Sequence, residues 1–243
     1  MHNTHPLTNY FDCIYIINLL ERLDRRAEME EQLNKINLSL THPKIHLFSA
    51  VKPDSAGEFD SIGARGCFMS HLGILKHAKS HQYQKILVLE DDLNFTSDFS
   101  SRIDQVIDAL SKHDWALFYG GYLGLNGLSN ESNQGVINIS PLVTFHASHF
   151  IAFQGQAIAD LVDYLSLLIT RKGGDPRGGP MHVDGAYYNF RVKGSKTFIA
   201  FPELGYQRAS RTDIHVLSWQ DKLPVFRHVL CYLRKVKNKL AKK

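Results

Sequence analysis

The sequence predicts a mixed α/β fold, a mostly parallel sheet with helices on both of its faces. Short apolar segments rich in β-branched residues alternate along the chain with segments whose apolar residues recur at helical spacing. The run Ile-Leu-Val-Leu at 86–89 is apolar throughout, as expected of a strand buried on both faces. Glu90, Asp91 and Asp92 follow this run directly, at the strand end where open α/β sheets bind their ligands.

The first half of the chain carries the regular alternation. In the segment 66–78 the residues Cys67, His71, Ile74, Leu75 and Ala78 fall on one face of a helix. The expected strands are 13–19, 44–51, 86–89 and 115–121, and the expected helices are 22–36, 66–78 and one that includes 103–110.

After Gly121 the pattern loosens into the Gly-, Asn- and Ser-rich loop 121–135. The elements expected beyond it are extended segments 136–140 and 144–153, a helix near 156–169, a Gly/Pro-punctuated loop 171–180, a helix 182–192 and a last strand 197–207. With no internal repeat and no evident linker, we expect one domain over residues 1–221 and a tail over 222–243.

Composition and charge narrow the class of protein. Hydrophobic residues are 44% and charged residues 21% of 243, which is ordinary for a globular protein. Three scattered cysteines argue against a disulfide framework and against a Cys-x-x-Cys zinc site. The first ten residues lack the features of a signal peptide, so we expect a cytoplasmic protein. No nucleic-acid partner is expected.

The tail 222–243 carries eight Lys and Arg and no acids, so without it the net charge of +4 becomes −4. Its apolar residues from Val225 to Leu240 recur at helical spacing, which predicts a basic amphipathic helix lying on an anionic membrane surface. The protein would then be peripheral on the inner face of the membrane. The alternative is that this stripe packs on the body or on another subunit.

The three carboxylates suggest a cation site. Alternation along a strand would put Glu90 and Asp92 on one side and Asp91 on the other. Clustered carboxylates can hold a divalent cation through oxygen. A helix cap or a solvated turn is the alternative.

Polar residues after the first predicted strand suggest a phosphate site. Asn18, Arg22 and Arg25 lie where a nucleotide commonly docks on an α/β sheet, and arginine forks bind phosphate well. The alternative is a solvated helix face on which these arginines pair with neighbouring acids such as Asp24.

Two further positions carry candidate chemistry. Gly66, Ser70 and His71 are expected near a helix N-terminus, where exposed N–H groups favour anions, although a lone histidine on an apolar face is more often a core residue. Asp184 is expected at a helix start beside a Gly/Pro loop, as an N-cap or as a general base.

Several blocks together resemble a known family. They are "IINLLERLDRR", "FSAV", "GARGCFMSHLGILKHA", "ILVLEDDLNF", "HVDGAYY" and "FPELGYQRASRTDI", in that order over residues 13–214. In order and spacing they resemble glycosyltransferase family 25, of lipopolysaccharide/lipooligosaccharide type, which includes collagen galactosyltransferases. The Gly-Cys-x-x-Ser-His block followed by Leu-Glu-Asp-Asp is the most specific part.

The resemblance implies a GT-A-like, Rossmann-related fold that binds a nucleotide sugar, usually UDP-galactose, and transfers the sugar with inversion. The family's metal-binding Asp-x-Asp is represented by Glu90-Asp91-Asp92, and its Pro-x-Asp by His182-Val183-Asp184. Glutamate and histidine therefore replace the usual first residues of the two motifs.

The resulting expectation is an inverting hexosyltransferase with a UDP-sugar donor and a saccharide or lipid-linked acceptor. Asp92 is the expected direct ligand of Mn²⁺ or Mg²⁺, and Glu90 touches the ribose or the metal. Asp184 is the expected base, with Asp213 second. The alternatives are a non-catalytic sugar- or nucleotide-binding protein of the same fold and a metal-dependent hydrolase.

Overall fold

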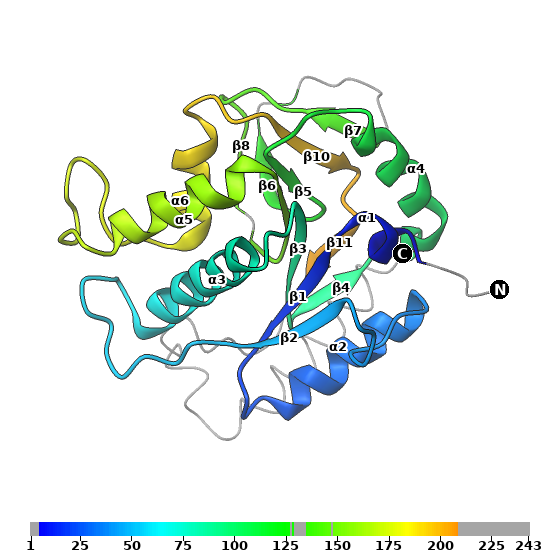
Figure 1. Cartoon of the computed structure of the whole chain (residues 1–243), viewed down its shortest axis with the longest axis horizontal. Helices are drawn as coiled ribbons and strands as arrows, with labels where there is room; N and C mark the ends of the chain where they lie inside the picture. Colours follow the sequence, from blue (N-terminus) through cyan, green and yellow to red (C-terminus); the bar gives the residue numbers. More distant parts are fainter. Residues whose placement is uncertain (1–4, 127, 129–134, 147, 209–243) are drawn as a thin grey trace.

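A computed structural model describes residues 5–126, 128, 135–146 and 148–208. Its centre is a seven-stranded sheet of order β2-β1-β3-β9-β5-β10-β7 (Figure 1). The strands are β1 (Cys13–Asn18), β2 (Ile45–Ser49), β3 (Lys85–Glu90), β5 (Leu117–Tyr119), β7 (Gly135–Asn138), β9 (Phe150–Gln154) and β10 (Thr197–Phe201). Only β9 and β7 run against the others, so the expected mostly parallel sheet is confirmed.

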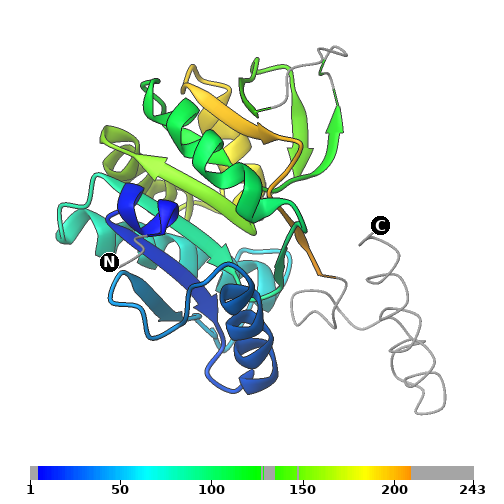
Figure 2. The ribbon, with the colours of Figure 1, turned by 90° about the vertical axis from the view of Figure 1, so that its right-hand side faces the viewer.

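Helices cover both faces of the sheet, as expected. One apolar core lies between the sheet and α3 (Ile62–Ser80), α5 (Gln156–Leu168) and α6 (Val183–Arg191). The other core lies against α1 (Pro6–Tyr10), α2 (Leu23–Lys35) and α4 (Phe99–Ser111). Figure 2 looks onto the second face, with α2 and α4 in front of the strands and α3 behind them.

Alternation along β3 decides which face each acidic side chain meets. Ile86 and Val88 belong to the core against α3, whereas Leu87 and Leu89 belong to the core against α2. Glu90, the last residue of β3, lies beside His71 of α3, and the next residue, Asp91, binds Arg25 of α2, as a period of two predicts. The expected separation of these two carboxylates is therefore confirmed.

Helix α3 begins earlier than predicted. Ser61 is its N-cap, and the Ser61 hydroxyl accepts a hydrogen bond from the Ala64 N–H at 3.0 Å. Gly66 lies inside the helix, where a Cβ would meet the Val51 carbonyl oxygen at 2.6 Å, so glycine is there for close packing. The prediction that Ser70 and His71 lie near a helix N-terminus is wrong, because both are buried in the middle of α3.

Two predicted strands are each divided in the structure. The segment 144–153 forms β8 (Thr144–His146) and β9, and the segment 197–207 forms β10 and β11 (Gly205–Gln207). Pro202 lies between β10 and β11 and has no N–H to donate to a ladder. The partner of β8 is β6 (Leu123–Asn126), in the predicted loop, and the partner of β11 is the unpredicted β4 (Leu93–Phe95).

The predicted tail 222–243, Asp213 and the boundary at residue 221 lie outside the described residues, so they stay predictions. Within the described ranges, no helix combines the length and the apolar character needed to cross a membrane.

Candidate active site

Two cavities open beyond the carboxyl ends of β1 and β3. The first, of about 180 Å³, lies between the end of β1, the segment 50–53 and the first turns of α3. The second, of about 140 Å³, lies between the end of β3, the residues before β9, the start of α6 and β11. This is the edge at which open α/β sheets bind ligands.

Cys67 and Glu90 line both cavities, so they form the wall between them. A ligand in the first cavity and a ligand in the second would therefore meet at these two side chains. That arrangement suits a reaction that joins two substrates, because each cavity can hold one of them.

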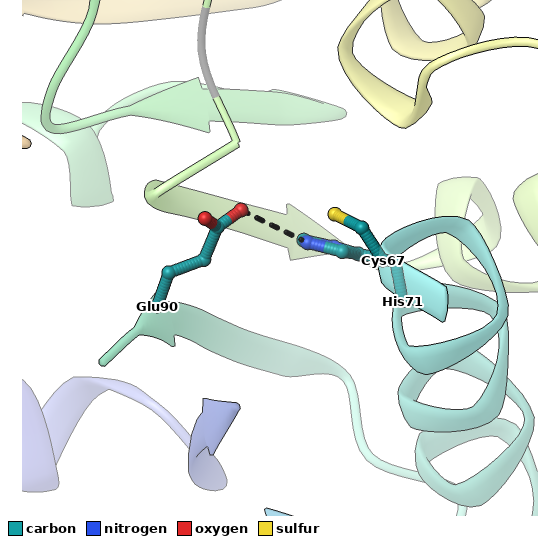
Figure 3. A group of neighbouring side chains, drawn as sticks. All are labelled: Cys67, His71 and Glu90. Atoms are coloured by element: carbon teal, nitrogen blue, oxygen red, sulfur yellow. Dashed lines mark hydrogen bonds and ion pairs between the residues drawn. The ribbon is translucent and has the colours of Figure 1, made fainter. Parts of the chain in front are cut away.

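Glu90 is held by side chains from two other parts of the chain. Its Oε1 accepts a hydrogen bond from the Ser148 hydroxyl at 2.6 Å and lies 3.4 Å from Nε2 of His71 (Figure 3). The other ring nitrogen of His71, Nδ1, is 3.0 Å from the Tyr187 hydroxyl on α6. Burial alone would raise the pKa of Glu90, but the bonds with His71 and Ser148 leave it below its ordinary value.

Asp91 joins β1, α2 and the end of β3. Its carboxylate accepts hydrogen bonds from Nδ2 of Asn18 at 2.7 Å and from a guanidinium nitrogen of Arg25 at 2.9 Å. Burial raises the pKa of Asp91, and the Arg25 charge and the Asn18 bond oppose that rise. The structure thus joins Asn18 and Arg25 of the predicted phosphate site to Asp91 of the acidic cluster, and their binding of a nucleotide stays a prediction. Arg25 and Asp91 line the first cavity, whereas the amide of Asn18 orients Asp91.

Arg22 is placed as the alternative interpretation expected. Its guanidinium binds the Asp24 carboxylate through Nε at 2.9 Å and a second nitrogen at 2.8 Å. The guanidinium of Arg22 is directed at Asp24, so the binding of a ligand by Arg22 stays a prediction.

Ser70 also has a local role. Its hydroxyl donates to the Gly66 carbonyl at 2.7 Å and accepts from the Val51 N–H at 2.8 Å, which ties α3 to the segment after β2. Ser70 also lines the first cavity, together with Ile62 and Gly63 at the start of α3. Binding of an anion by Ser70 or His71 stays a prediction.

Asp92 is the least satisfied carboxylate of the site. Its Oδ2 accepts a hydrogen bond from Nε2 of Gln207 at 3.2 Å and lies 3.7 Å from Arg25, while its buried Oδ1 has no hydrogen-bond partner among the described residues. Burial, and then the charge of Glu90, raise the pKa of Asp92 to about 7. Asp91 and Asp92 both lie in the turn after β3, and both approach Arg25, so strand alternation does not hold Asp92 on the side of Glu90 as predicted.

These features fit a divalent cation. A buried carboxylate oxygen without a partner and a second carboxylate close enough to raise its pKa are what a hard, oxygen-binding ion would relieve. Asp92 and Glu90, the residues predicted to bind metal, are therefore chemically suited to Mn²⁺ or Mg²⁺.

Asp184 lies in the first turn of α6, and His182 is the N-cap. One carboxylate oxygen of Asp184 accepts from the Gly185 N–H at 2.8 Å, and the other is 3.3 Å from Nδ1 of His146. Asp184 lines the second cavity together with Glu90, and its side chain is 27% exposed. The expected position at a helix start is confirmed, and its carboxylate faces a cavity.

Sequence reasoning missed several side chains of the site. Cys67 was assigned only to an apolar helix face, although its spacing of four from His71 is a signal for two ligands on one helix face. Lys52, Ser148 and Gln207 line the cavities without any motif that marks them in the sequence. They reach the site because β2, β9 and β11 bring distant parts of the chain to the same edge.

Comparisons with solved structures find matches of low similarity. A glycosyltransferase involved in the glycosylation of the major capsid of PBCV-1 matches with a TM-score of 0.47 and 12% identity, over 82% of this chain and 94% of that one. At this similarity, the fold assignment rests on the strand order and on the sequence family.

Curated relatives have family names consistent with the site. Procollagen galactosyltransferase 1-B of Xenopus laevis is 30% identical over 129 residues, 46% of this chain and 21% of the relative. Procollagen galactosyltransferase 2 of Mus musculus is 27% identical over 192 residues, 72% and 29% of the two chains. Inactive glycosyltransferase 25 family member 3 of Homo sapiens is 25% identical over 158 residues, 58% and 26%. The matches thus span less than a third of each relative's length.

The model of glycosyltransferase family 25, described as an LPS biosynthesis protein, matches residues 11–134. That range is half of the chain and contains Asn18, Arg25, Cys67, His71 and the three carboxylates at the end of β3, Glu90, Asp91 and Asp92. The chain belongs to glycosyltransferase family 25.

Proposed function

We propose that the protein transfers a hexose, galactose in the first instance, from a UDP-sugar to a hydroxyl group of a saccharide or lipid-linked acceptor, with inversion. The observation that carries this proposal is the pair of cavities divided by Glu90 and Cys67. Family membership supports glycosyl transfer, and the names of two relatives support galactose.

The first cavity suits the nucleotide sugar. It lies at the end of β1, it is lined by the cations Arg25 and Lys52, and the N-terminus of α3 opens into it. Cationic side chains and helix N-terminal N–H groups both stabilise phosphate charge. Apolar residues of the same cavity, such as Ile17 and Val51, provide surface for an uncharged part of the donor.

Asp92 and Glu90 would hold the divalent ion beside this cavity. A bound Mn²⁺ or Mg²⁺ would supply stabilisation of the charge that develops on the leaving diphosphate. The Ser148 and His71 contacts fix the Glu90 carboxylate in position, so little reorganisation is needed when ligands bind.

Asp184 is the proposed general base in the second cavity. Its carboxylate would take the proton from the acceptor hydroxyl while that oxygen forms a bond to the anomeric carbon. The bond from the anomeric carbon to the diphosphate oxygen breaks, and UDP leaves with the electron pair. Attack from the second cavity on a sugar whose diphosphate lies in the first one accounts for inversion.

A thermal-shift screen tests donor binding. At a hundredfold excess over the dissociation constant, the UDP-sugar should raise the unfolding temperature by roughly 5–10 °C, because it binds only the folded state. We expect UDP-galactose to act more strongly with Mn²⁺ than with EDTA, and GDP-mannose to have little effect. Equal shifts with all nucleotide sugars, or none, would contradict the proposed donor.

A non-catalytic binding protein is the second candidate. Some relatives are named inactive members of the family, and in this chain Arg25 already pairs with Asp91 and approaches Asp92. Donor binding without UDP release, in the presence of a panel of saccharide and glycolipid acceptors, would favour this candidate over the transferase.

Membrane contact through the tail 222–243 and a cytoplasmic location are proposed from sequence alone. Each Lys or Arg near an anionic surface contributes on the order of 1 kcal/mol at modest salt. The full chain should therefore co-sediment with phosphatidylglycerol vesicles, less so at high salt, and a chain ending at Leu223 should not. Equal partitioning of the two forms would rule out the tail as the anchor.

A further inference from the structure

Three side chains of different chemistry meet at the wall between the two cavities. Cys67 Sγ, a ring nitrogen of His71 and a carboxylate oxygen of Glu90 all lie within 4.8 Å of one another (Figure 3). We propose that this cluster binds a transition-metal ion of the Zn²⁺ type. The site shares Glu90 with the oxygen-binding pair Asp92 and Glu90, whereas Cys67 and His71 are ligands of this site alone. The proposal concerns metal binding and does not depend on the proposed transferase activity.

The ligand types select the ion. Thiolate, imidazole and carboxylate together suit Zn²⁺ or Co²⁺, whereas Mg²⁺ and Mn²⁺ prefer oxygen ligands alone. Cys67 and His71 are four residues apart on α3, so they lie on one helix face, and Glu90 ends β3 opposite them. Figure 3 shows the sulfur and the imidazole projecting from the helix toward the carboxylate.

Three protein ligands leave a position open for a fourth. Cys67 and Glu90 both line the two cavities, so a water or a substrate oxygen entering either cavity can reach that position. Structural zinc sites are closed by four protein ligands, whereas sites that keep an open position bind substrates or water. The cluster is of the open kind.

The surrounding residues orient the donors as in metal sites. Nδ1 of His71 is 3.0 Å from the Tyr187 hydroxyl, which leaves Nε2 for the Glu90 side. Ser148 donates to Glu90 at 2.6 Å. Partners of this kind fix the tautomer of a histidine ligand and the direction of a carboxylate ligand.

Cobalt titration of the full chain, freed of metal with EDTA and then desalted, tests the site. We expect about one equivalent of Co²⁺ to give a near-ultraviolet thiolate-to-cobalt absorption band that Zn²⁺ abolishes and excess Mg²⁺ does not. Cys67→Ser should lose the band, whereas Cys13→Ala and Cys231→Ala should keep it. Absence of the band in the wild type, or its survival in Cys67→Ser, would overturn the proposal.

A second variant separates a metal site from an ordinary interior His–Glu pair. Tyr187→Phe should weaken Zn²⁺ binding roughly 10–100-fold, because it removes the partner of His71 Nδ1. Tyr15→Phe is the matched control, since it removes a tyrosine bond to Nδ1 of His77 on the same helix (2.7 Å) away from the cluster. Equal Zn²⁺ affinities in both variants and the wild type would contradict the proposal that Tyr187 orients His71 for metal binding.

Asp92→Asn keeps the proposed failures distinguishable. This variant should retain the cobalt band while losing Mn²⁺-supported sugar transfer. If the variant keeps both the band and its transfer activity, the proposed function is contradicted and the transition-metal site is not. If the variant loses the band, the independence of the transition-metal site from Asp92 is contradicted, whatever its transfer activity.

Discussion

Asp184→Asn should lower the turnover number roughly 10²–10⁴-fold and leave the dissociation constant of the donor within about threefold. The amide cannot take the acceptor proton, but it keeps the shape of the side chain at the start of α6. Asp184 lines the second cavity with Glu90 and does not line the first, so donor contacts should survive. Turnover with UDP-galactose and calorimetric titration of the donor measure the two quantities separately.

Asp163→Asn is the control for this variant. Asp163 is an exposed acid on α5 that pairs with Lys79, so its replacement should change neither quantity. If Asp184→Asn instead weakens donor binding and keeps its turnover, Asp184 belongs to the donor site. The base must then be sought elsewhere, first at Asp213.

Asp92→Asn should reduce metal-supported transfer roughly 10²–10³-fold, because it removes one charged ligand where leaving-group charge develops. The measurement is the initial rate of transfer as a function of Mn²⁺ concentration. Asp98→Asn is a matched control, since Asp98 is an exposed acid at the start of α4 that pairs with Arg102 away from the site. Wild-type activity of Asp92→Asn at low Mn²⁺ would show that the carboxylate has a structural role only.

The same substitution should stabilise the metal-free fold above neutral pH. The pKa of Asp92 is about 7 in the folded protein against an ordinary value of 3.8, so the folded state keeps a proton that the unfolded chain releases. The contribution of protonated Asp92 to the free energy of unfolding is therefore fully present below about pH 4 and is lost as the pH rises from there to about 7. Asparagine does not titrate, so the Asp92→Asn variant does not lose stability in this way.

With EDTA at pH 8, the Asp92→Asn variant should be more stable than the wild type by on the order of 2 kcal/mol, and unfold some 4–8 °C higher. At pH 4 the two proteins should unfold at nearly the same temperature. A variant less stable than the wild type at pH 8 would show that Asp92 is ionised and well compensated in the fold. This gain of stability with loss of activity is expected of a residue retained for function.

The sequence alone determined the class of fold and the edge on which the site lies. Apolar runs such as 86–89 and the helical spacing of 22–36 specify buried strands and a covering helix, because side-chain period reports which face is buried. The same period of two predicted that Glu90 and Asp91 diverge, and the structure confirms it. Asp184 was likewise placed at a helix start by its position after a Gly/Pro loop.

Local signals failed where packing between distant segments decides the conformation. Gly66 suggested a helix start, but it lies within α3. Glycine is needed at this position because the Val51 carbonyl approaches the helix closely there. Short strands such as β4, β6 and β11 have too few residues for a periodic signal, and they form because a partner strand is available.

Only the tertiary structure decided which side chains meet. Antiparallel insertion of β9 between β3 and β5 brings Ser148 to Glu90, and the contact of α3 with the end of β3 sets Cys67 and His71 beside the same carboxylate. β11 brings Gln207 to Asp92 across 115 positions of the chain. Residue types along a chain record local burial and conformational preference, whereas such contacts follow from the packing of the whole sheet and its two helix layers.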